Sequence, residues 1–139
     1  MMARICFFWL LCGSLLWAAP PADDLRHTEP GGAGPRDAAT EQDAEWQRRL
    51  EAGQAFYNAG RHNEAIREFR AAVRLRPNDS MTQLWLARAL GRKAEKANPL
   101  RAAFLVGDIR RAFERAVQLD PSNLEARSDL LEFYLDAPG

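Results

Sequence analysis

The stretch that decides the fold is "GRHNEAIREFRAAVRLRPND", residues 60–79. Its apolar side chains recur at i, i+4, i+7 and i+8 and therefore share one face of a helix: Ala65, Phe69, Ala72 and Val73. Gly60 indicates a turn before this helix, Asn63 is expected to cap its start, and Pro77 ends it. A helix this short is not stable alone, so its apolar face must pack against a neighbouring element.

A second apolar stripe lies directly upstream, and it consists of Trp46, Leu50, Gly53 and Tyr57. Only the short segment 58–60 separates the two stripes. Helices joined by so short a connection lie antiparallel and side by side. Residues 46–79 are therefore predicted to form a helical hairpin.

The end of this hairpin recurs later in the chain, because "RAAVRLRPND" (70–79) is repeated as "RAVQLDPSN" (115–123). In both copies a Phe precedes the Ala-Val pair, and a new helix is expected three residues after the proline. Ser122 and Glu125 have the spacing of a capping box for the last helix. The pattern is typical of an internal repeat of helical hairpins.

Residues 46–79 resemble a tetratricopeptide repeat, a helical hairpin of about 34 residues. The resemblance rests on small, aromatic and turn positions that occur in register: Gly53, Phe56, Gly60, Ala65, Phe69, Ala72 and Pro77. Small side chains let the two helices approach closely, and the Phe side chains fill the space between them. The resemblance implies an all-α, right-handed α-solenoid of about five helices over residues 41–139.

The second unit, 80–123, departs from the standard repeat by an insertion of about ten residues between Gly91 and Gly107. Asn98 followed by Pro99 is a typical helix start. We therefore expect long helices at about 80–97 and 100–119, with a possible break at Gly107. The third unit, 124–139, supplies only a first helix.

Large side chains on this last helix, Phe133, Tyr134 and Leu135, have no following helix to cover them. Three interpretations remain open: the helix is a poor cap, it packs against a partner or a second copy of the chain, or the chain is an N-terminal fragment of a longer repeat protein whose activity lies downstream.

Residues 1–19 have the pattern of a signal peptide, with Arg4 before the apolar run 5–19. This run of 15 residues would span about 22 Å as a helix, less than the roughly 30 Å of a bilayer core. We therefore expect export to the bacterial periplasm or secreted space, with inner-membrane anchoring by residues 5–19 as the alternative and membrane contact only in that case. Residues 20–40, rich in Pro, Gly and Ala, are expected to form a disordered tether.

Charge is unevenly distributed along a chain whose net charge is zero. Residues 46–119 contain fifteen Lys and Arg against seven Asp and Glu, whereas 20–45 and 120–139 are acidic. The basic stretch could be a solvated face, could attract an acidic partner, or could attract the acidic tether. Nucleic acid is not expected as a partner, because no recognition motif accompanies the arginines.

First helices of tetratricopeptide repeats line a concave groove that binds peptides. Carried over by position, the groove residues expected here are Gln47, Gln54, Tyr57, Asn58, Met81, Leu84, Arg88 and Arg92. The family's clamp for a peptide carboxylate is not expected, since the first helix of unit one has no lysine. Trp46 is expected either to tie this helix to the second unit or to cover the open end of the solenoid, and Tyr57 is expected to be half-buried.

The sequence shows no catalytic constellation and no spacing typical of a metal or cofactor site. His27 lies in the expected tether, and His62 lies in a hairpin turn where a packing role is expected. Both cysteines, Cys6 and Cys12, belong to the expected signal peptide. The function expected is therefore a non-enzymatic scaffold that binds a protein or peptide without metal or cofactor.

Overall fold

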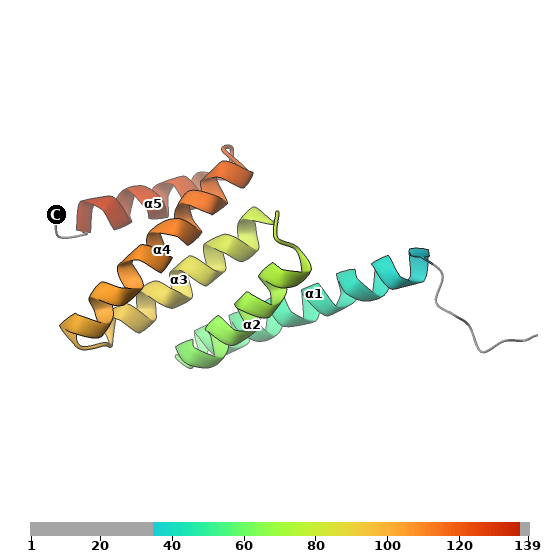
Figure 1. Ribbon diagram of the computed structural model, residues 1–139, viewed down its shortest axis with the longest axis horizontal. Coiled ribbons are helices and arrows are strands. Elements are labelled where there is room, and N and C mark those ends of the chain that lie inside the picture. The colour runs from blue at the N-terminus through green and yellow to red at the C-terminus, as the bar shows by residue number, and fades with distance from the viewer. Residues whose placement is uncertain (1–34, 137–139) are drawn as a thin grey trace, which may run out of the picture. The chain divides into compact units, whose positions relative to one another are not determined.

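The computed structural model describes residues 35–136, which form five α-helices and no strand. The helices are α1 (Pro35–Asn58), α2 (His62–Leu75), α3 (Ser80–Glu95), α4 (Pro99–Leu119) and α5 (Leu124–Asp136), and Figure 1 shows their order. The expected all-α architecture is confirmed for this part of the chain. The expected signal peptide and most of the tether lie outside it, and residues 35–40, expected in the tether, belong to α1. None of the described helices has the length and apolar character needed to cross a membrane.

Consecutive helices pack as antiparallel neighbours, and α1, α3 and α5 also contact one another in order. The helices therefore form two layers, with α1, α3 and α5 in one layer and α2 and α4 in the other (Figure 1). Each hairpin contacts only the next, as in a helical repeat array. This arrangement agrees with a tetratricopeptide-like helical solenoid.

Close approach of α1 and α2 depends on Gly53, as the sequence predicted. A Cβ atom added at Gly53 would lie 2.5 Å from Cε1 of Phe69. Phe69 is fully buried, and its ring stacks on Trp85 of α3 with the ring centroids 6.0 Å apart. One aromatic side chain thus joins three helices through a gap that only glycine leaves open.

Trp46 joins α1 to α3, which is the first of its two expected roles. Its indole N–H donates to Oγ1 of Thr82 at 3.1 Å, and the Arg76 guanidinium lies 3.9 Å above its ring. Thr82 is fully buried and donates its own hydroxyl hydrogen to the carboxylate of Asp79 at 2.6 Å. The buried side-chain polar atoms of this junction all have hydrogen-bond partners, which offsets the cost of burying them.

Asp79, Asn98 and Asn123 cap the starts of α3, α4 and α5. Their side-chain oxygens accept from backbone N–H groups three residues ahead, at 2.7, 2.9 and 3.0 Å. The expected cap at Asn98 is confirmed.

Two other predicted caps were wrong. α2 begins at His62 after Arg61, with no side-chain cap, so Asn63 is already inside the helix. Gly60, at φ 72°, and two backbone bonds tighten the turn and fix this earlier start. Ser122 bonds to Asp120 instead of capping α5.

α4 runs without a break through Gly107, so the possible interruption there does not occur. A glycine inside a helix costs only about 1 kcal/mol relative to alanine. Burial of Ile109, Ala112, Phe113 and Ala116 on the following turns offsets this cost. The insertion therefore lengthens α3 and α4 rather than adding a separate element.

Candidate functional site

The predicted groove residues lie on α1 and α3, but they do not form a single surface. Tyr57, Arg88 and Arg92 line one open hollow between α3, α4 and α5, with a volume of about 600 Å³. Gln47 is exposed and bonds to Glu51 on its own helix. Met81 lies at the other end of α3, beside Asn123.

Leu84 was wrong as a groove residue, because its side chain is completely buried in the core. Leu84 lies on the face of α3 that packs against α2 and α4, so its side chain points into the core. Gln54 is half-buried and Asn58 is exposed at the end of α1, and neither lines the hollow.

We call the hollow between α3, α4 and α5 the acidic groove. Its charged residues are Arg88, Arg92, Glu95, Asp129, Glu132 and Asp136, and its apolar surface includes Val106, Ile109, Phe113 and Phe133. Acidic side chains outnumber basic ones by four to two. This part of the surface is therefore acidic, although most of the sequence that forms it is basic.

Arg88 holds α5 in place at one side of the acidic groove. Its Nε donates to Asp129 at 2.5 Å, and its Nη2 donates to Glu125 at 3.1 Å. Burial lowers the pKa of Arg88, but the two carboxylates outweigh burial and raise it overall. The arginine predicted to face a ligand is thus occupied by acidic residues of the chain's own last helix.

Arg92 is also engaged, one turn further along α3. Its Nε donates to the Tyr57 hydroxyl at 3.4 Å, and its Nη1 donates to Glu95 at 3.1 Å. The Tyr57 hydroxyl and then Glu95 raise the pKa of Arg92. Tyr57 is half-buried and contacts Trp85 edge-on at 5.5 Å between centroids, which confirms its predicted packing.

Glu132 and Asp136, in contrast, have no hydrogen-bond or ion-pair partner among the described residues. Both lie on the α5 side of the groove, beside Phe133. Their negative charges are uncompensated, so this rim attracts cations.

The apolar wall of the groove comes from α4 and α5. Val106 is 39% exposed, whereas Ile109 and Phe113 are buried beneath it. Phe133 packs on Phe113 with centroids 6.0 Å apart, so the expectation that Phe133 is uncovered was wrong. Tyr134 is half exposed but donates its hydroxyl hydrogen to Glu114 at 2.7 Å, and Leu135 remains exposed.

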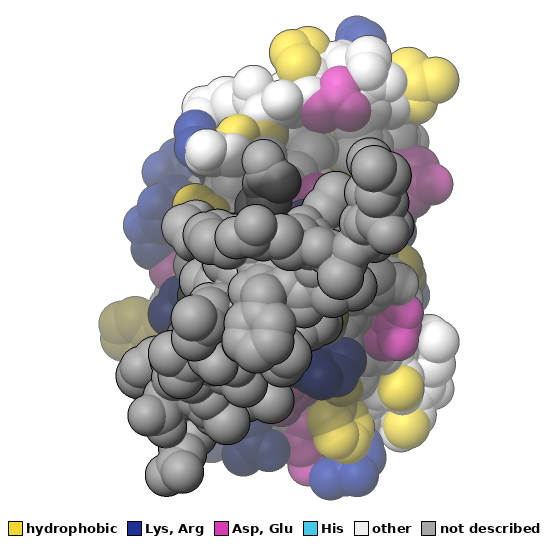
Figure 2. Space-filling model, turned by 90° about the vertical axis from the view of Figure 1, so that its right-hand side faces the viewer, with side chains coloured by type: hydrophobic (Ala, Val, Ile, Leu, Met, Phe, Trp, Pro, Cys, Tyr) yellow, Lys and Arg dark blue, Asp and Glu magenta, His cyan; other side chains and the backbone are white. Residues whose placement is uncertain are grey.

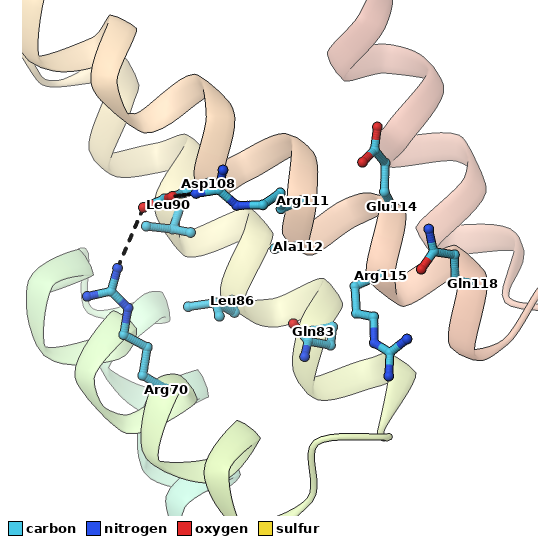
Figure 3. A pocket seen from close by; sticks show the side chains of 10 residues that line it. All are labelled: Arg70, Gln83, Leu86, Leu90, Asp108, Arg111, Ala112, Glu114, Arg115 and Gln118. Atoms are coloured by element: carbon cyan, nitrogen blue, oxygen red, sulfur yellow. Dashed lines mark hydrogen bonds and ion pairs between the residues drawn. The ribbon is translucent and has the colours of Figure 1, made fainter.

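A second hollow lies on the other layer, between α2, α3 and α4, and Figure 3 shows its lining residues. Arg70 and Asp108 face each other across it with a 3.9 Å ion pair, and Arg111 also pairs with Asp108. Its floor residues Leu86 and Leu90 are buried. Asp108 is paired with both arginines, and the two leucines are buried. This hollow therefore has less unpaired charge and less exposed apolar surface for a partner to contact than the acidic groove has.

Lys and Arg side chains elsewhere are interspersed with acidic and apolar ones. Figure 2 shows dark blue, magenta and yellow side chains mixed on the part of this face where side chains are coloured. On the described helices no group of three or more His, Cys, Asp or Glu side chains is arranged to hold a metal ion.

Comparison with known proteins supports the interpretation of the first hairpin. Residues 50–79 match the tetratricopeptide repeat family model. Repeats of this family are in general non-catalytic modules for protein–protein interaction. A search of the curated proteins found no match to the chain.

Proposed function

We propose that the protein is a non-enzymatic interaction module and that the acidic groove binds a segment of a protein partner. The observation that carries this proposal is the combination of an apolar wall with an uncompensated acidic rim. Val106 and Phe133 offer apolar contact area, and Glu132 and Asp136 offer unpaired negative charge. A peptide segment matches such a surface when apolar and charged side chains alternate along it.

The segment that fits best is an amphipathic helix or extended strand with basic residues. Its apolar side chains would cover Val106 and Phe133, which would supply most of the affinity. Its Lys or Arg side chains would face Glu132 and Asp136 and would mainly set specificity and the rate of association. The groove's own arginines, Arg88 and Arg92, are already paired, so they do not repel these cations strongly.

We further propose that the module works outside the bacterial cytoplasm, in the periplasm or secreted space. The support is the apolar run at residues 5–19 after Arg4. N-terminal sequencing of the protein recovered from cell fractions tests this proposal. Recovery of the intact N-terminus from the cytoplasm would contradict it, and recovery of the intact chain from the inner membrane would favour anchoring by residues 5–19.

The groove proposal is tested by site-directed photocrosslinking in the native host. A photoreactive benzoylphenylalanine placed at Val106 lies in the groove, and the same group at Arg67 is an exposed control on α2. We expect a specific crosslinked protein from position 106 only. Mass spectrometry of the crosslink should locate it in a segment with apolar residues at helical or alternating spacing and with Lys or Arg beside them.

A charge reversal distinguishes binding in the groove from incidental proximity. Glu132→Lys with Asp136→Lys should reduce the crosslink at position 106 severalfold without unfolding the protein, since both side chains are exposed. Equal crosslinking from positions 106 and 67, or a crosslinked segment that is acidic, would rule the groove out as the binding surface.

A further inference from the structure

A third hollow lies where the α1–α2 turn and the α3–α4 turn meet at one edge of the stack. We call it the turn-edge hollow. It has a volume of about 610 Å³, and the residues that matter here are Arg61, His62, Lys93, Lys96, Arg101 and Phe104. It shares no lining residue with the acidic groove, so an inference about it stands apart from the proposed function.

The turn-edge hollow is strongly basic. Its lining contains four cationic side chains and a single acidic one, Glu64. Glu64 is already paired with Arg61 at 3.0 Å. Lys93, Lys96 and Arg101 have no side-chain hydrogen-bond or ion-pair partner on the described helices. Three positive charges therefore line one concavity without compensation, an arrangement that favours an anionic ligand.

The two lysines are notable because they are the only lysines in the whole sequence. Apart from two histidines, every other basic residue of the chain is arginine, and many of those arginines form ion pairs within the described helices. Lysine presents a compact charge on a flexible stem, which can follow ligands of variable geometry better than a bidentate arginine does.

His62 also experiences this positive charge. Burial lowers the pKa of His62, and the charges of Lys96 and Arg92 lower it further, against a smaller opposing effect of Glu95. Its Nδ1 atom is buried and has no hydrogen-bond partner among the described residues. An anion bound beside Lys96 would weaken the repulsion, so the His62 pKa can report whether the hollow is occupied.

The rim of the hollow carries a large apolar side chain. Phe104 is 76% exposed, although it lies on a helix whose other Phe, Phe113, is buried. An exposed aromatic residue beside unpaired cations fits a ligand with both anionic and apolar groups. Two ligands of this kind are an acidic peptide and an anionic lipid surface.

The geometry favours the peptide. Adsorption to lipid needs basic residues that face one plane, whereas these cations surround a concavity into which individual side chains can enter. We propose that the turn-edge hollow binds an acidic peptide segment of a protein partner, with Asp or Glu carboxylates against Lys93, Lys96 and Arg101 and an apolar side chain against Phe104. The protein would then have two binding surfaces of opposite charge, one for a basic segment and one for an acidic segment.

The two lysines allow a direct test in the full chain. Reductive ¹³C-dimethylation keeps their charge and gives one NMR signal for each lysine side chain, besides that of the N-terminal amine. The probe is the synthetic peptide Glu-Glu-Phe-Glu-Glu, and its uncharged counterpart is Gln-Gln-Phe-Gln-Gln. We expect both lysine signals to shift with the acidic peptide, the His62 pKa to rise, and neither change to occur with the uncharged peptide.

Two triple variants distinguish binding in the turn-edge hollow from nonspecific electrostatic attraction to the whole protein. Lys93→Gln, Lys96→Gln and Arg101→Gln together should weaken binding of the acidic peptide about tenfold. Arg67→Gln, Arg74→Gln and Arg127→Gln remove the same charge from exposed positions elsewhere and should leave the affinity nearly unchanged. Equal weakening in both variants, or no shift of the lysine signals at millimolar peptide, would overturn the proposal.

Phosphatidylserine vesicles test the alternative ligand, an anionic lipid surface. This arm is read only at the two lysine signals, because the apolar run 5–19 could associate with lipid on its own. Vesicles that perturb both lysines while the acidic peptide does not would show that the hollow faces a membrane and would overturn the peptide assignment.

Discussion

Gly53 and Gly91 both lie inside helices, yet their surroundings give them different roles. A Cβ at Gly53 would lie 2.5 Å from the Phe69 ring, whereas a Cβ at Gly91 would meet nothing within 4 Å. The sequence identified Gly53 correctly, because its repeat position requires a small residue where two helices cross. The sequence also predicted that Phe69 fills the space between the helices, but it did not show that the Phe69 ring lies directly against Gly53.

Gly53→Ala is therefore expected to lower the free energy of unfolding by about 1–3 kcal/mol, because the added methyl group displaces a ring that cannot move freely. Gly91→Ala is the matched control and should raise the free energy of unfolding by up to about 1 kcal/mol, through helix propensity alone. Urea unfolding followed by circular dichroism measures both. Equal effects of the two substitutions would contradict the close approach of α1 and α2.

His62 gives the stability a pH dependence near neutrality. Because burial, together with Lys96 and Arg92, places its folded-state pKa below 6.5, the unfolded chain binds the proton first as the pH falls. The free energy of unfolding should therefore decrease as the pH is lowered through about 6.5 and level off below the folded-state pKa. Carboxylates with lowered pKa values, such as Glu45 and Glu64, lose their contribution only at more acidic pH.

The variant His62→Phe should lack the decrease that begins near pH 6.5, but it should keep the decrease at more acidic pH that the carboxylates cause. His27 is present in both proteins, so its contribution cancels in the comparison. Thermal unfolding across this pH range measures the difference. Parallel pH profiles for the two proteins would show that His62 is not the group responsible.

At the scale of single elements, the sequence predicted helix existence better than helix ends. The 3.6-residue apolar periodicity extends over many residues, so it identified α2, α3, α4 and α5 reliably. Caps depend on a few backbone angles at one position, and several polar residues compete for each. The turn at Gly60 makes α2 begin at His62, one residue before Asn63. Asn123 caps α5, which was the role expected of Ser122.

Asp79 is the cap with the largest network, since it accepts from the Thr82 backbone and hydroxyl, and Thr82 in turn accepts from Trp46. Asp79→Ala should lower the free energy of unfolding by about 1–2 kcal/mol. Asn63→Ala should change it by less than about 0.5 kcal/mol, because Asn63 caps nothing. A larger loss at Asn63 than at Asp79, measured by urea unfolding, would reverse our assignment of the caps.

The attachment of α5 depends on Arg88 more than on any other charged residue. Arg88→Met keeps the aliphatic stem but leaves the carboxylate of Asp129 half-buried and unpaired. We expect faster amide hydrogen exchange in α5, with little change in α1 and α2.

Arg92→Met is the control, because Arg92 bonds to Tyr57 and Glu95 and not to α5. Hydrogen exchange followed by mass spectrometry compares the two variants. Unchanged exchange in α5 after Arg88→Met would mean that apolar packing alone holds this helix.

For the whole molecule, the repeat pattern predicted which helices are neighbours but not the charge of the surface they create. Residues 46–119 are basic in sequence, and attraction of an acidic partner was one of the interpretations that this charge left open. In the structure, Arg88 is paired by α5, which also contributes Glu132 and Asp136 to the same surface. Charge summed along a sequence cannot reveal this reversal, because ion pairs between distant segments depend on the final packing.

The exposed apolar residues of α5 bear on whether the whole molecule self-associates. Leu124, Leu131 and Leu135 are all more than half exposed, and self-association through this helix remains a prediction. Leu131→Gln with Leu135→Gln should leave the unfolding free energy within about 0.5 kcal/mol of the original value, since neither side chain is in the core. Sedimentation velocity on the same variant shows whether any dimer of the original protein disappears. Loss of more than about 2 kcal/mol without a dimer would mean that these residues stabilise the monomer.

The measurement that tests the central claim most directly is hydrogen exchange of the full chain with and without the partner segment located by crosslinking at Val106. The account predicts new protection in the second half of α3, the middle of α4 and the second half of α5, which together form the acidic groove, and none in α2. Protection confined to α2, or spread evenly over all five helices, would contradict it.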